Sequence, residues 1–172
     1  MKKLLVVGLS AFLLAACGDT EVTEKEVGKV DSSEKTESVE EAPQKEQDVI
    51  KVDKEIANTD AVKITLVDVT KTVDKEFDEE YIEVKYEVEN KLDKTIAVQA
   101  AEVSADGKMV DESMLDMSQE VSAGKVADAV LTIQNYEGDL PTLEKNLEMI
   151  LNVFDNETYE DIEKHNVSVD FK

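Results

Sequence analysis

Two side chains carry the nucleophilic and acid–base chemistry that this sequence could offer, and each type occurs once. Cys17 is the only cysteine and His165 the only histidine among 172 residues. A Ser-His-Asp triad would need His165, and the sequence has no Gly-x-Ser-x-Gly motif of the kind that presents a nucleophilic serine. His165 lies in a polar stretch before the last apolar segment, which predicts a surface position. We therefore expect no enzyme and no catalytic residues.

Cys17 ends a segment with the composition of an export signal. Two lysines precede an apolar run over residues 4–16, and small residues lead into Cys17. A basic start, a short apolar stretch and a small-residue cleavage zone are typical of a secretory signal peptide, here residues 1–16. The run is shorter than the roughly 20 residues that a stable membrane-spanning helix needs.

The residues Leu14-Ala15-Ala16-Cys17 resemble the lipobox of bacterial lipoproteins. The resemblance implies that Cys17 carries a diacylglycerol thioether, that the leader is cut before it, and that the new amino terminus is acylated. Two acyl chains at one residue suffice for stable anchoring, whereas one does not. The resemblance thus implies lipidation at Cys17 and a place at the cell membrane, on its extracellular face. With Cys17 so used, neither a disulfide within this chain nor a Cys/His zinc site can form.

Acidic loops are the best candidates for metal binding. One loop contains Asp78 and Glu79, and another contains Asp155 and Asp161. Calcium takes about six to eight oxygen ligands from such loops, although neither loop has the spacing of an EF-hand. We assign no metal site and no cofactor, and keep these four residues as weak candidates for calcium.

Met109, Met114 and Met117 form a methionine-rich stretch. Thioethers can bind copper(I). Methionine more often fills gaps in a core or forms an adaptable contact surface, and we favour that interpretation.

The charge of the chain limits its partners. Acidic residues number 41 against 19 lysines, there is no arginine, and the formal net charge is −22. Nucleic-acid binding depends on a basic surface, so we expect no nucleic-acid partner. The same charge argues against a second, electrostatic contact with an anionic membrane surface.

Residues 17–60 are rich in Glu, Lys, Ser and Thr. Such a segment buries too little apolar surface to offset its ordering entropy, so we predict a disordered acidic tether behind the lipidated cysteine. A flexible chain of this length spans roughly 35–40 Å. Val49, Val52 and Ile56 have helical spacing, while Ile50 and Val52 alternate as in a strand, which leaves open a short ordered piece that docks on the domain.

Residues 61–172 change to a period of two, which is typical of strands. The segment from Ile82 to Val88 alternates most cleanly, and a change of phase at Val67 and Val69 predicts either a β-bulge or a strand buried on both sides. Asp106-Gly107 predicts a hairpin turn. Residues 141–151 also fit a helix with a proline in its first turn, but we favour a strand because the segment ends in Asn-Val-Phe and its neighbours are strands. Six or seven short strands predict an all-β, antiparallel β-sandwich.

The strand over residues 81–90, the polar turn after it, Asp106-Gly107-Lys108 and Gly124-Lys125 form a pattern that resembles a known extracellular module. It is similar to the immunoglobulin-like domain of unknown function found in many Gram-positive lipoproteins, whose fold resembles a mycobacterial secreted immunogenic protein. The resemblance implies an immunoglobulin-like fold and an extracellular setting, and no reaction.

Together these features predict a membrane-anchored extracellular lipoprotein whose β-sandwich is a non-catalytic binding module. Its partner would be a wall component, a secreted peptide such as a bacteriocin, or a neighbouring envelope protein. The alternative is a protein that binds calcium or a small ligand through its acidic loops.

Overall fold

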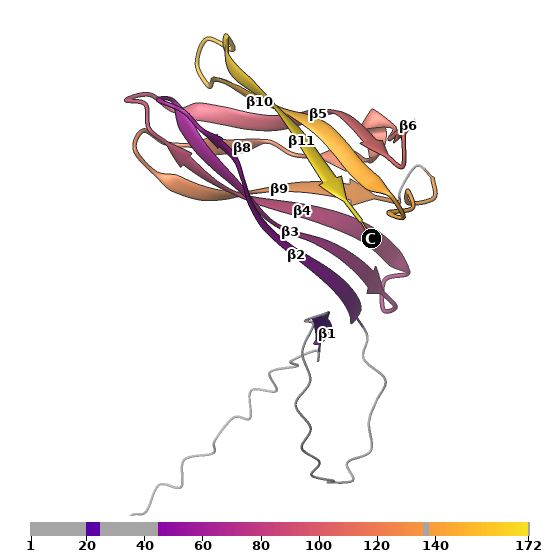
Figure 1. Cartoon of the computed structure of the whole chain (residues 1–172). Coiled ribbons are helices and arrows are strands. Elements are labelled where there is room, and N and C mark those ends of the chain that lie inside the picture. Colours follow the sequence, from indigo (N-terminus) through magenta and orange to yellow (C-terminus); the bar gives the residue numbers. More distant parts are fainter. Residues whose placement is uncertain (1–19, 25–44, 136–137, 172) are drawn as a thin grey trace, which may run out of the picture.

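The computed structural model describes residues 20–24, 45–135 and 138–171, and its chain path is shown in Figure 1. The predicted signal peptide, Cys17 and residues 25–44 lie outside the described residues. The described parts of the chain are built almost entirely from strands, and no helix in them is long and apolar enough to cross a membrane. The elements are β1 (Thr20–Glu24), β2 (Lys45–Asn58), β3 (Val62–Asp74), β4 (Glu79–Asn90), β5 (Ile96–Ala105), β6 (Lys108–Met109), the 3-10 helix η1 (Glu112–Met114), β7 (Leu115–Asp116), β8 (Gln119–Val121), β9 (Val126–Gln134), β10 (Asn146–Asp155) and β11 (Asp161–Asp170).

The strands form two packed sheets, and the prediction of an antiparallel β-sandwich is confirmed (Figure 1). The first sheet has the order β1-β2-β3-β4-β9-β7 and the second the order β11-β10-β5-β6, with β8 also paired to β5. All of these pairings are antiparallel except that of β1 with β2. An immunoglobulin sandwich has the sheets A-B-E-D and G-F-C. The order β3-β4-β9-β7 opposite β11-β10-β5 reproduces this arrangement, and β2 adds a strand beyond the position of strand A.

The predicted strand signals correspond to real strands. In β4, Ile82, Val84, Tyr86 and Val88 are all fully buried. The predicted bulge at Val67 is confirmed, because the register of β3 against β4 shifts between Leu66 and Asp68.

The predicted hairpin at Asp106-Gly107 is also confirmed. It joins β5 to β6, and both of its turn residues have positive φ, 52° and 81°. This is the conformation that two-residue hairpin turns of the I′ type require.

The ambiguity over residues 141–151 is resolved in favour of a strand. Residues 138–145 contain no helix, and β10 occupies residues 146–155. β10 lies between β5 and β11, so both of its edges are hydrogen-bonded. One face of β10 is buried and the other is partly exposed, but that second face carries the apolar Ile150 and Phe154. Apolar residues on both faces are why the sequence also fitted a helix.

The predicted boundary between tether and domain was wrong. β2 occupies residues 45–58, which the sequence analysis assigned to the disordered tether, and it pairs with the whole length of β3. β2 is mostly exposed, and within it only Ala57 is buried. Two register shifts also interrupt the alternation of its side chains between the two faces of the sheet. β2 is held instead by its backbone pairing and by ion pairs such as Lys45–Asp74, at 2.9 Å. The folded domain therefore includes residues 45–60, in addition to the predicted 61–172.

The two sheets meet in one apolar core, and a polar contact between two buried side chains crosses it. The Tyr86 hydroxyl on β4 donates to the Met149 sulfur on β10 at 3.0 Å, and both side chains are buried. β4 and β10 occupy the positions of strands B and F, which a disulfide joins in antibody domains. Here a tyrosine–methionine pair joins them instead.

Candidate functional site

The acidic candidate Asp155 is engaged in holding its own turn. Its carboxylate accepts hydrogen bonds from the backbone N–H groups of Glu157 and Thr158, at 2.9 and 3.0 Å, and lies 2.8 Å from the Lys94 ammonium. Asp155 is 8% exposed. The hydrogen bond and charge of Lys94, with those two N–H groups, hold the pKa of Asp155 well below its usual range. This carboxylate therefore stabilises the β10–β11 turn.

The other acidic candidates do not lie beside it. Asp78 and Glu79 lie at the β3–β4 turn, at the opposite end of the sandwich from Asp155. Asp161, at the start of β11, forms an exposed ion pair with Lys164 at 2.9 Å. Within the described ranges, no three His, Cys, Asp or Glu side chains are grouped so that they could hold a metal ion.

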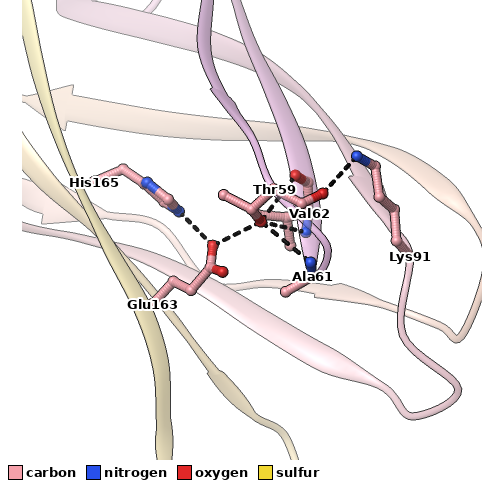
Figure 2. Close-up of polar contacts among 6 residues, drawn as sticks. All are labelled: Thr59, Ala61, Val62, Lys91, Glu163 and His165. Atoms are coloured by element: carbon pink, nitrogen blue, oxygen red, sulfur yellow. Dashed lines mark hydrogen bonds and ion pairs between the residues drawn. The ribbon is translucent and has the colours of Figure 1, made fainter.

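His165 lies in a network that ties the two sheets together, as Figure 2 shows. Its Nε2 is 3.0 Å from a Glu163 carboxylate oxygen on β11, and the same oxygen accepts from the Thr59 hydroxyl at 3.0 Å. Thr59 belongs to the β2–β3 turn, and its hydroxyl also accepts from the backbone N–H groups of Ala61 and Val62 at 3.1 Å. The carboxylate thus lies between the histidine and the hydroxyl. A histidine that activates a hydroxyl as a nucleophile must contact that hydroxyl directly. This network instead connects the two sheets through hydrogen bonds.

The three methionines separate into different environments. Met109 is 61% exposed and Met114 8% exposed, while Met117 packs partly buried against the core. Met109 and Met114 face a common hollow.

That hollow lies at the end of the sandwich that holds the β5–β6 hairpin. It has a volume of about 850 Å³ and lies between the β5–β6 hairpin with η1 on one side and residues 138–142 on the other. Its apolar lining residues are Ala105, Met109, Val110, Met114, Leu140 and Pro141, and its charged ones are Asp106, Lys108, Asp111 and Asp139. We call it the methionine cleft. Its size is within the range of ligand sites, which are mostly apolar with a few polar groups.

Asp106 fixes one wall of the methionine cleft. One carboxylate oxygen accepts from the Thr142 hydroxyl at 2.8 Å and from the Glu144 N–H at 3.1 Å. The other accepts from the N–H groups of Lys145 and Asn146, at 2.7 and 3.1 Å. These bonds, that of Lys145 above all, lower the pKa of Asp106 to about 2. One side chain in a hairpin turn therefore positions the segment that leads into β10.

A second, smaller hollow lies on the other side of the same segment. Its volume is about 350 Å³, and Leu140, Pro141 and Thr142 line it as they line the methionine cleft. Ile50 and Lys71 form part of the opposite wall, on β2 and β3. Residues 140–142 therefore form a ridge between two hollows.

Sequence reasoning found the turn at Asp106 and the methionines, but neither the cleft nor the task of the Asp106 carboxylate. The carboxylate binds residues 36 to 40 positions further along the chain, and a turn signal carries no information about such a contact. The one available signal was the proline-containing segment 138–145, which has neither strand nor helix periodicity.

No family model, no curated protein and no solved structure matches this chain.

Proposed function

We propose that this protein is a lipid-anchored binding module on the extracellular face of a bacterial cell membrane, and that its ligand occupies the methionine cleft. The observation that carries the binding role is the cleft itself, an apolar hollow of about 850 Å³ with a mostly exposed methionine in its wall. Exposed apolar surface in a concave site favours ligand or partner binding over simple solubility. A non-catalytic role is proposed because the one histidine is bound to Glu163.

Support for the membrane anchor comes from the sequence. The basic start, the apolar run and Leu14-Ala15-Ala16-Cys17 together form the lipobox pattern. Two acyl chains on Cys17 would hold the protein at the membrane without a spanning helix.

Membrane fractionation with intact-mass analysis tests the anchor. The unaltered chain should sediment with membranes and carry a diacylglycerol mass on a fragment that begins at Cys17. The Cys17→Ser variant should instead appear in the soluble exported fraction. Full membrane retention of Cys17→Ser, or an unmodified thiol on the mature protein, would contradict the anchor.

Site-specific crosslinking tests the cleft. A photoreactive side chain at position 109, within the methionine cleft, should trap one discrete species on intact cells. The matched position is Val126, which is similarly exposed at 57% but begins β9 at the opposite end of the sandwich. Identical crosslinked products from positions 109 and 126 would contradict a role for the cleft.

A further inference from the structure

The methionine cleft combines an apolar lining with an acidic surround. Three of its charged lining residues, Asp106, Asp111 and Asp139, are acidic and one, Lys108, is a lysine. Asp106 is fully used in holding residues 142–146, but Asp139 is exposed beside the apolar Leu140 and Pro141. Within a chain of net charge −22, this surface attracts cations and repels anionic ligands.

The shape of the surface suits an extended or helical chain better than a compact small molecule. The ridge at residues 140–142 has the methionine cleft on one side and the 350 Å³ hollow on the other. Ile50, which is 38% exposed, offers a second apolar contact in the smaller hollow. A ligand that crosses the ridge can place one apolar side chain in each hollow, as peptides do when they dock several anchors in a groove.

The cleft also lies at the end of the sandwich where β2 begins. Lys45, the first residue of β2, pairs with Asp74 beside the β3–β4 turn. The end of β9 and the start of β4 lie at that same end, as does the β5–β6 turn, whose Asp106 bonds to Asn146. Cationic amphipathic peptides accumulate on anionic membrane surfaces. If the chain is anchored through Cys17, the protein is tethered to the surface on which such peptides concentrate.

From these three observations we propose that the methionine cleft binds cationic amphipathic peptides and so withholds them from the membrane surface. Apolar side chains of the peptide contact Met109 and Leu140, and its lysines or arginines lie against Asp139 and the acidic surround. The location of the encounter, at the membrane surface, rests on the proposed function. The binding itself rests on the cleft alone.

The test uses the whole chain with Cys17→Ser, so that binding is measured in solution without lipid. The probes are three fluorescent peptides of about 14 residues with helical periodicity, built from Leu and Lys, Leu and Glu, or Leu and Ser. Anisotropy titrations are run at about 0.15 M salt, where long-range attraction between exposed charges is largely screened. We expect the Leu/Lys peptide to bind and the Leu/Glu peptide not to bind.

Matched variants locate the site. Met109→Thr removes the exposed apolar wall and Asp139→Lys reverses a local charge; each should raise the Kd for the Leu/Lys peptide about five- to tenfold. Val126→Thr and Asp60→Lys make the same chemical changes on exposed residues at the other end of the sandwich, and should leave the Kd within about twofold. Circular dichroism of all four variants checks that each remains folded.

Each alternative outcome overturns the inference. Absent binding, equal binding of the Leu/Lys and Leu/Glu peptides, or equal losses in Asp60→Lys and Asp139→Lys would each contradict a cationic-peptide site in the cleft. Equal binding of the Leu/Ser peptide, still weakened by Met109→Thr, would overturn the charge requirement but leave the proposed binding function standing. Failure of membrane anchoring would affect the proposed function and not these titrations.

Discussion

Replacing Met149 with leucine should destabilise the domain mainly through a residue on the other sheet. The Tyr86 hydroxyl lies in the core, where its side chain is fully buried, and the Met149 sulfur at 3.0 Å is its hydrogen-bond partner. Burial also raises the pKa of Tyr86 above its usual value, because the tyrosinate would have to form without water. Leucine fills a similar volume but accepts no hydrogen bond.

The expected magnitude has two parts. The change of shape from methionine to leucine costs less than about 1.5 kcal/mol at a buried site. Leaving the hydroxyl without a partner adds roughly 1–3 kcal/mol. With Tyr86→Phe already present, only the first part remains, so the double-mutant cycle should give a coupling free energy of about 1–3 kcal/mol.

Urea denaturation of the four chains measures this coupling. With an m-value of about 1–3 kcal/mol/M, Met149→Leu alone should lower the midpoint by roughly 1 M. The same substitution should have a clearly smaller effect beside Tyr86→Phe. If Met149→Leu costs the same free energy in both backgrounds, the hydroxyl–sulfur contact contributes nothing and the reasoning is refuted.

Three further predictions concern turns and edges. Asn90→Ala should lower the free energy of unfolding by about 2–4 kcal/mol in urea, because this fully buried amide donates to two backbone carbonyls at 2.8 Å; the exposed Asn58→Ala is the control, and an equal loss there would contradict the assignment. Asp106→Asn should lower the free energy of unfolding at neutral pH, and its difference from the unaltered chain should shrink as pH falls from about 4 towards 2. The Asp106 carboxylate has a pKa of about 2 in the folded chain against an ordinary 3.8. Its contribution to stability is therefore present above pH 3.8 and is lost as pH falls from 3.8 to about 2. A difference that stays constant from pH 7 to 2 would count against it. A chain that begins at residue 61 should aggregate or fail to fold, whereas one that begins at residue 45 should give a dispersed NMR spectrum, because β2 covers the open edge of β3; equal spectra from both would show that β2 is dispensable.

The sequence was most informative where one face of a strand is buried. In β4, apolar and charged residues alternate because each strand face meets a different environment, and the burial of Ile82 and Val88 follows directly. It was less informative for β2, where backbone bonds to β3 replace apolar burial and only the alternation of Ile50 and Val52 indicated a strand. A polar strand such as residues 45–58 has nearly the composition of a linker, and its two register shifts interrupt the alternation.

The candidate site was harder to predict for a different reason. Its walls come from residues 105–114 and 138–142, which are separate in the sequence and meet only because β5 and β10 are neighbours. No local pattern records that meeting. The methionines could be identified as unusual, but their spacing did not show that Met109 in β6 is exposed and that Met114 in η1 is buried.

The carboxylates of this acidic chain divide into two groups with different consequences for binding. Asp74, Asp106 and Asp155 each accept backbone N–H groups at a turn or its neighbour, and hydrogen bonds hold the pKa of each below its ordinary value. The oxygens of such a carboxylate already accept hydrogen bonds that stabilise the fold. An acidic loop is therefore a poor guide to a metal site here. An exposed acid such as Asp139 lies instead among the lining residues of an apolar hollow. A carboxylate beside apolar surface favours an amphipathic cation over calcium, because a hard ion such as calcium gains nothing from Met109 and Leu140.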